Sequence, residues 1–467
     1  MSRYAALLLL VMPSFLVPPA HAQEGGEGAS SSAPNRLALA ECVALALAHS
    51  PRLEGAAAAT AEATAMRLSA RGRFGPVVRL DANVLRWDSA FALPINIPDS
   101  LTKKVEPFLG KVDIPPIPVR DVTTAQVSAT VVQPLTGLWT VYEGHQALSL
   151  GEDAARHQQR ATRNDVVLAV ADAYLQALEA ERMIELAGAQ VRTIEAHVER
   201  ARQFLKSDLI ARNEVLGAEV RLAEARALLI QAKGGARLAR ANLAFQMGLP
   251  DQEVWPEDLP APPLAAATSA TTEDAPSGEA GNRPELAVAS ARVNQARQGV
   301  RLAASQMAPE VNALFKVEHV EGLHIQPPTS WFVGAQLSWN IWEWGSTFYA
   351  IDAARARAQQ AEAGETRARE GLRLEMMQAE IEVETTTEQL RVARAAVTQA
   401  EQNLEIVEQR FAQQAGTSTD VLDAQALLNA IRVRETSAAY GVLRAQVRWR
   451  RARGLDPVAM EGEGGAR

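Results

Sequence analysis

The chain has 467 residues, of which 47% are hydrophobic, 22% charged and 5% aromatic, and its net charge is −8. Length alone would suggest about three globular domains, but few aromatic residues together with abundant alanine are typical of proteins built from long helices. The acidic balance disfavours nucleic acid as a partner.

The N-terminus predicts an export signal. Arg3 precedes an apolar run from Ala5 to Val17, and Ala20-His21-Ala22 has the small residues of a cleavage site. Such a run is too short for a membrane-spanning helix and is followed at once by the cleavage site. We therefore expect residues 1–22 to be a signal peptide and the mature chain to begin at Gln23.

An internal repeat divides the mature chain into two halves. Ser50-Pro51-Arg52-Leu53 returns as Arg283-Pro284-Glu285-Leu286. Further pairs are Ala63/Ala296, Ala70/Ala303, Pro76/Pro309 and Val78/Val311, and, after a shortened offset, Gly137/Gly345, Phe204/Phe411, Val215-Leu216/Val421-Leu422 and Ala218/Ala424. We place the first repeat at residues 23–250 and the second at 283–455. A Pro/Ala-rich linker at 251–282 and a disordered Gly/Glu tail at 456–467 complete the chain.

Each repeat is expected to contain a helix, two strands, a long helix and a return helix. The ranges are 52–73, 77–87, 125–133, 138–205 and 213–247 in the first repeat, and 285–307, 310–320, 331–341, 345–411 and 419–453 in the second. The loop at about 89–124 is Pro-rich and is expected to face the exterior. Because the rise per residue is equal, the two shorter helices of each repeat could run end to end along the long one.

The long helix of the second repeat carries one apolar stripe. Its members alternate three and four residues apart: Leu372, Met376, Ala379, Val383, Thr386, Leu390, Ala393, Val397, Ala400, Leu404, Val407 and Phe411. Nearly six heptads without a glycine or proline predict a helix packed along others, and the whole helix would be about 100 Å long. The first repeat has its own seam, which includes Val170, Ala177, Val191, Ile194, Val198 and Ala201.

The strands have the length and alternation of transmembrane β-strands. Apolar Val333, Leu337 and Trp339, for example, alternate with polar neighbours. Six of the eight tryptophans lie in or beside the strands and predict an aromatic girdle at the membrane surface: Trp87, Trp139, Trp331, Trp339, Trp342 and Trp344. Four strands per chain cannot close a barrel in lipid. We therefore expect a homotrimer whose copies share one twelve-stranded barrel, continued by an α-helical barrel.

These features together resemble the TolC family of bacterial outer-membrane efflux and secretion channel proteins. The export signal, the repeat, the Ser-Pro-x-Leu helix start, the paired strands and Gly416 followed by Asp420-Val-Leu-Asp-Ala-Gln carry the resemblance, which covers about Leu37 to Leu455. It implies a trimeric β-barrel in outer-membrane lipid and a long α-barrel in the periplasm. It also implies two partners, a periplasmic adaptor (membrane fusion protein) at the helical tips and a proton-driven or ATP-driven inner-membrane pump.

The resemblance further implies that Asp420 and Asp423 line the periplasmic entrance as a selectivity ring. Their spacing of three places both carboxylates on one helical face, and a threefold axis would gather six negative charges that attract cations. The simpler alternative is that Asp420 or Thr419 only caps the return helix.

Four further residues are implied to form the tip gate and to contact the adaptor: Glu214, Arg212, Phe411 and Gly416. Glu214 lies where the family has a gate-locking carboxylate. Phe411, or Gln413, takes the place of a gate tyrosine, and Gly416 breaks the helix. No arginine lies between Gly416 and Asp420, so Arg212 is the candidate substitute across the tip.

The predicted function is a passive exit duct, the outer-membrane component of a tripartite efflux system for small toxic compounds. One alternative is the exit channel of a type I protein secretion system. A second is a periplasmic adaptor, which would have one helical hairpin between split lipoyl-like β halves. Catalytic and nucleotide-binding motifs are missing from the sequence, so we expect neither an enzyme nor a cofactor. His319 and His324 are expected to be solvated loop histidines rather than metal ligands.

Overall fold

The computed structural model describes residues 36–95, 115–257 and 283–457, which lie within one compact unit. The predicted signal peptide, most of the predicted linker, most of the tail and the middle of the Pro-rich loop lie outside the described residues. Among the residues that are described, no helix is both long enough and apolar enough to cross a membrane.

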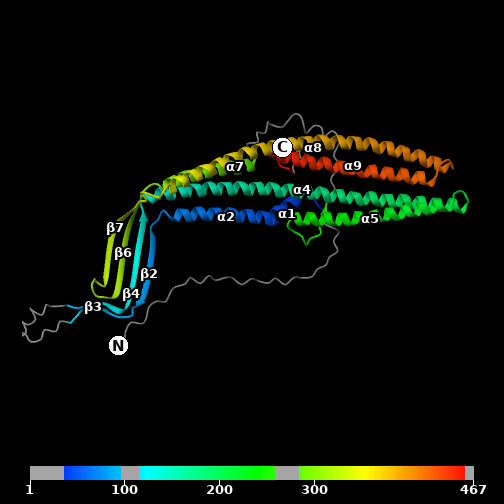
Figure 1. Ribbon diagram of the computed structural model, residues 1–467. Helices are drawn as coiled ribbons and strands as arrows, with labels where there is room; N and C mark the ends of the chain where they lie inside the picture. The colour runs from blue at the N-terminus through cyan, green and yellow to red at the C-terminus, as the bar shows by residue number, and fades with distance from the viewer. Residues whose placement is uncertain (1–35, 96–114, 258–282, 458–467) are drawn as a thin grey trace, which may run out of the picture. The chain divides into compact units, whose positions relative to one another are not determined.

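Six helices follow the predicted order closely, and they are α2 (Pro51–Gly72), α4 (Gly137–Lys206), α5 (Arg212–Gln246), α7 (Pro284–Ser305), α8 (Ser346–Ala412) and α9 (Ser418–Ala452). The long helices α4 and α8 have 70 and 67 residues, which corresponds to about 100 Å each. α2 and α5 both contact α4, and α7 and α9 both contact α8 (Figure 1). The end-to-end arrangement predicted for the shorter helices is therefore confirmed.

The apolar stripe predicted for α8 is also confirmed. Every member from Leu372 to Phe411 is buried or half-buried, and Leu390 is 1% exposed. The stripe packs on α9, as the contacts of Ala379 and Val383 with Ala445 and Trp449 show. α4 additionally contacts α7 and α9, so it joins the two repeats.

The largest core lies where α1 (Leu39–His49) packs on α4, α5 and α9, around Cys42, Tyr174 and Leu443. Burial, and to a lesser extent Glu41, raises the pKa of the Cys42 thiol to about 11. A two-stranded parallel sheet of β1 (Arg36–Leu37) and β5 (Trp255–Pro256) adjoins this core. The Tyr174 hydroxyl donates to the carbonyls of Leu37 and Glu257, at 3.2 and 2.8 Å. The predicted linker therefore begins with an ordered strand, which periodicity could not reveal in a two-residue element.

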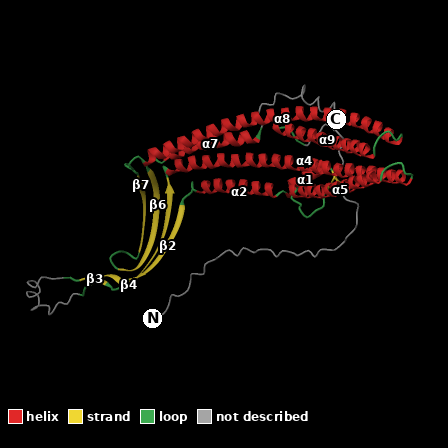
Figure 2. Ribbon diagram, turned by 45° about the vertical axis from the view of Figure 1, so that its right-hand side comes forward, coloured by secondary structure: helices red, strands yellow, loops and turns green. Residues whose placement is uncertain are grey.

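The main sheet has the antiparallel order β2–β4–β6–β7 (Figure 2). Its strands are β2 (Val77–Arg86), β4 (Ile117–Pro134), β6 (Glu310–Leu323) and β7 (Thr329–Ser338). The short β3 (Phe91–Leu93) pairs with β4. The predicted start of the second strand at 125 is wrong, because the end of the Pro-rich loop pairs as well. Val122 accepts from Trp87 N–H at 2.7 Å and Val119 accepts from His324 N–H at 3.0 Å.

Residue pairing across the sheet places the apolar side chains on one face. Val78 pairs with Val131, Val131 with Phe315, and Phe315 with Val333. Val78, Leu80, Val84, Val333 and Leu337 are 65–73% exposed. The opposite face is mixed; there Glu318 accepts from Lys316 at 2.7 Å and from Gln126 at 3.3 Å, and Phe332 pairs with Lys316. An exposed apolar face this continuous indicates contact with lipid or another apolar surface.

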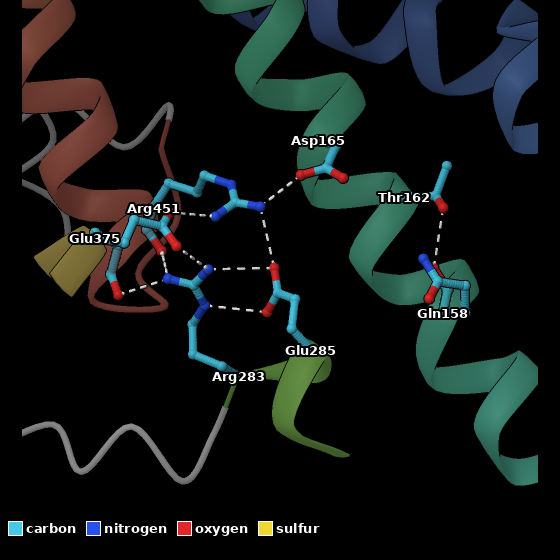
Figure 3. Close-up of polar contacts among 8 residues, drawn as sticks. Gln158, Thr162, Asp165, Arg283, Glu285, Glu375 and Arg451 are labelled. Carbon is cyan, nitrogen blue, oxygen red and sulfur yellow. Dashed lines mark hydrogen bonds and ion pairs between the residues drawn. The ribbon is translucent and has the colours of Figure 1, made fainter. Parts of the chain in front are cut away.

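An ionic cluster joins α4, α7, α8 and α9 (Figure 3), and we call it the Arg283–Arg451 cluster. Arg451 donates to Asp165, Glu375 and Glu285 at 2.5, 2.7 and 3.0 Å. Arg283 donates to Glu285, to Glu375 and to the carbonyl of Ala452. Burial opposes ionisation of Glu285, but the hydrogen bonds from Arg283, a backbone hydrogen bond and the charges of Arg283 and Arg451 together lower the Glu285 pKa. The cluster fixes the relative positions of the two repeats near the middle of the long helices.

Candidate functional site: the helical tips and the sheet

The two helical hairpins turn with the same backbone geometry, at the same end of the long helices (Figure 1). Leu209 N–H donates to the Phe204 carbonyl at 2.9 Å, and Ala415 N–H donates to the Arg410 carbonyl at 2.8 Å. Asp208 and Gln414 have φ angles of +55° and +61°. Such turns close helix C-termini with a left-handed residue.

This geometry corrects two details of the predicted turns. Phe204 is equivalent to Arg410 rather than to Phe411, so the repeat keeps one offset through both turns. Gly416 does not have the left-handed conformation; Gln414 does, and α8 already ends at Ala412. A Cβ on Gly416 would lie 3.4 Å from the Cβ of Arg410. Such a Cβ would make an ordinary van der Waals contact, so neither packing nor a special φ angle requires glycine at position 416.

Asp420 takes part in the cap of α9. Its Oδ2 accepts from the backbone N–H of Thr417 at 2.9 Å and from the Thr417 hydroxyl at 2.8 Å, and Thr417 Oγ1 accepts from Asp420 N–H at 3.2 Å. This is a capping box, so a capping role for Asp420 is observed. The hydrogen bonds from Thr417 and the charge of Arg410 hold the pKa of Asp420 below its usual value. Asp420 is exposed, so it remains a charged surface group as well.

Glu214 is the equivalent residue of the first hairpin, but its carboxylate points elsewhere. The N-cap of α5 is Ala211, which offers no hydroxyl. Glu214 Oε2 instead accepts from the backbone N–H of Ser418, at 3.2 Å, on the second hairpin. Two differences in side chain, Ala211 against Thr417 and Glu214 against Asp420, thus accompany the change from a capping carboxylate to a contact between hairpins.

Asp423 is exposed and pairs with Arg221 of α5, with 3.4 Å between Arg221 Nη2 and Asp423 Oδ1. Arg212, the predicted partner across the tip, is exposed and has no ion pair with any residue in the described ranges. The arginine that reaches across the tip is therefore Arg221, which lies about two and a half turns further along α5. Its spacing of seven from Glu214 places both on one side of α5, a signal that the sequence contained.

Phe411 lies inside the tip rather than at its surface, with 6% of its area exposed. Its ring contacts Phe204 and His197 of α4, with centroids 5.5 and 5.4 Å apart. His197 was missed by sequence reasoning, although it directly precedes the seam residue Val198. Its Nε2 lies 2.7 Å from the hydroxyl oxygen of Ser418.

The six tryptophans of the predicted girdle fall into two groups. Trp331 pairs with Val317 near the β6–β7 turn, and Trp87 hydrogen-bonds Thr124 at 3.1 Å, also far from the helices along the strands. The second group lies where strands meet helices: Trp139, Trp339, Trp342 and Trp344. Eight residues separate Trp331 from Trp339, about 26 Å along a strand. An apolar band of about 25 Å between aromatic groups is the pattern of outer-membrane barrels.

His319, which was predicted in a loop, lies in β6, and His324 follows the end of that strand; each has a protein partner. His319 Nδ1 lies 2.8 Å from Thr329 Oγ1, and His324 Nε2 lies 3.1 Å from Asp121 Oδ1. No group of three or more His, Cys, Asp or Glu side chains suited to a metal ion occurs in the described part of the chain.

Comparison with known proteins identifies the class of protein that has this fold. Residues 275–455 match the model of the outer membrane efflux protein family. The structure resembles CusC, with a TM-score of 0.75, 14% identity and coverage of 89% of this chain and 92% of CusC. It also resembles VceC of Vibrio cholerae (TM-score 0.71, 18% identity, 90% and 96% covered) and the MtrE outer membrane channel of Neisseria gonorrhoeae (0.69, 20%, 89% and 89%).

A search of curated proteins found no match to this chain. The predicted resemblance to the TolC family is nevertheless confirmed, by sequence over the second repeat and by fold over about nine-tenths of the chain. The predicted fold class agrees with these matches. The adaptor alternative is wrong, because the structure has two helical hairpins and two strand pairs in the fold of outer-membrane channels.

Proposed function

We propose that three copies of this chain form a passive exit duct for small toxic compounds in the outer membrane. The observation that carries this proposal is the main sheet, which has one apolar face. Its edge strands, β2 and β7, pair with no further strand in the described residues. An unpaired strand edge in lipid leaves backbone groups without hydrogen bonds, at several kcal/mol for each group. Pairing β2 of one copy with β7 of the next removes both edges.

The helices support a duct that continues beyond the sheet. α4 and α8 each extend for about 100 Å. Their apolar seams pack on neighbouring helices of the same copy. Exposed apolar residues on α5, such as Val220, Ile230 and Leu238, provide further surface for a neighbouring copy. In this assembly a periplasmic adaptor would dock at the helical tips and an inner-membrane pump would supply cargo.

Asp423 is the residue that we propose for the selectivity ring. It is exposed, and its ion pair with Arg221 is long and open to solvent, so the pair neutralises little of its field. Asp420 adds a second charge at the same end of α9, while its hydrogen bonds also cap the helix. The two roles of Asp420 are compatible.

The test is planar-bilayer recording of the purified full-length protein, followed by complementation of cells that lack their own exit channel. We expect discrete cation-preferring conductance and restored tolerance to toxic small compounds. Cells that secrete a polypeptide substrate but stay sensitive to small compounds would support a secretion channel instead. A purified protein that stays monomeric and conducts no ions would overturn the duct.

A further inference from the structure

Ser418, the first residue of α9, makes two polar contacts with the first hairpin. Its hydroxyl oxygen lies 2.7 Å from Nε2 of His197 on α4, and its backbone N–H donates to Glu214 of α5. His197 and Ser418 are both 0% exposed. Asp420 and Asp423 follow on the same helix, so the position of Ser418 sets the position of both entrance carboxylates.

The surroundings of His197 suit a neutral imidazole only. Nδ1 is buried and has no hydrogen-bond partner in the described part of the chain. If Nε2–H donates to Ser418, then Nδ1 carries only a lone pair, which is tolerable in an apolar site. Protonation would place an unpaired N–H donor of a cation there, and burying such a group is strongly unfavourable.

The charged groups around the pair do not offset that cost. On α4 itself Arg200 repels an imidazolium. Glu214 of α5 and Asp420 of α9 already accept from Ser418 and Thr417, and Arg410 of α8 is a further positive charge near Asp420. The N-terminus of α9 adds the positive end of a helix dipole. Burial first, and Arg200 second, lower the pKa of His197 to about 4.

We propose that His197 is a positioning residue of the periplasmic entrance: its neutral ring fixes the N-terminus of α9 to α4, and protonation of the ring releases it. This inference rests on the proposed duct function, in which Asp420 and Asp423 line the entrance and would move with α9. When α9 is released, His197 becomes solvated and regains its ordinary pKa of 6.5. Acid therefore favours the released state, beginning near that pH and increasing down to about pH 4.

Hydrogen exchange of the full-length protein in lipid vesicles tests this directly. The peptide that begins α9, residues 413–425, would be followed at pH 7 and pH 5, with rates corrected for the intrinsic pH dependence of exchange. The two pKa values of His197, 6.5 and about 4, predict an opening equilibrium about twentyfold more favourable at pH 5. His197→Gln keeps a neutral polar group and should abolish the pH effect.

Two further variants complete the design. His157→Gln removes another histidine of α4 and should retain the full pH response. Ser418→Ala leaves the Glu214 contact in place and should speed exchange about tenfold at both pH values, which tests the pair even if His197→Gln folds poorly. An unchanged pH response in His197→Gln, or none in the unaltered protein, would overturn the proposal. The exchange assay needs no conduction, so failure of the duct hypothesis would be recognised separately.

Discussion

The Arg283–Arg451 cluster and the helical tips both join helices of the two repeats, but with very different strength. The cluster combines two guanidinium groups with three carboxylates and two backbone carbonyls. At the tips, Ser418 forms one hydrogen bond with His197 and one with Glu214, and Arg221 forms an exposed ion pair with Asp423. Buried, multiply bonded ion pairs tolerate little displacement, whereas exposed pairs contribute less than about 1 kcal/mol.

This difference indicates how such a chain could open at one end without coming apart. The middle of the long helices is fixed by charges that cannot separate without leaving a buried ion unpaired. At the tips, polar contacts of about 1 kcal/mol each lie beside the apolar contacts of Phe411 and Leu422 with the first hairpin. A partner that binds the tips therefore has no multiply bonded ion pair to break there, whereas the repeats stay in register.

The largest effect is expected from Arg451→Met in the cluster. Asp165 would lose its partner and Glu285 and Glu375 would keep only Arg283, and each hydrogen bond to a charged group typically contributes about 1.5 to 3 kcal/mol. We expect a clear drop in the thermal unfolding midpoint. Arg391→Met is the control, since its pair with Glu388 is exposed and should change stability by less than about 0.5 kcal/mol. Equal effects of the two variants would show that the middle is no more strongly held than the surface.

The second effect concerns ion selectivity at the tips. The double variant Asp420→Asn/Asp423→Asn should reduce the cation preference of the pore several-fold, because it removes six charges from a trimer. Asparagine keeps an amide oxygen, so the cap of α9 should persist. Asp352→Asn, an exposed residue of α8 paired with Arg355, is the control and should leave reversal potentials unchanged. Identical reversal potentials in all three proteins would exclude the ring.

A smaller, local effect is expected from Glu214→Ala. It leaves the Ser418 N–H without its acceptor, at a cost of about 1 kcal/mol. Exchange of the α9 start should become about fivefold faster, while the thermal midpoint stays the same. Glu219→Ala removes an ion pair within the first hairpin and should not affect α9. A shift of the midpoint by several degrees in Glu214→Ala would mean that the tips are as tightly held as the cluster.

The smallest effect is expected from a variant that tests the difference in capping between the two turns. Ala211→Thr gives α5 the capping residue that α9 already has, which should stabilise its first turn by about 1 kcal/mol. Glu214 would then form a capping box within α5 and release Ser418. Slower exchange at the α5 start together with faster exchange at the α9 start is the expected pattern. Slower exchange at both starts would contradict the inference that a missing capping hydroxyl at position 211 lets Glu214 bind Ser418.

Much of the fold could be predicted because long periodic segments carry a strong signal. The stripe from Leu372 to Phe411, the Ser50-Pro51 helix start and the alternation around Val333 all predicted elements that the structure contains within a few residues. The strand extension at residues 117–124 and the two-residue strand at Trp255 were not predictable. Their pairing is with distant backbone groups, which leave no periodic pattern in the sequence.

The sequence by itself determined the helices, the strands and their repetition, because the spacing of apolar residues decides which faces must be buried. Only the tertiary structure decided what the tip residues do. Asp420 and Glu214 occupy equivalent positions, yet one carboxylate turns to its own helix and the other to its neighbour. His197 likewise acquires its role only from Ser418, 221 residues away. A hydrogen bond acts over about 3 Å, so its partner is set by the packing of whole helices rather than by local sequence.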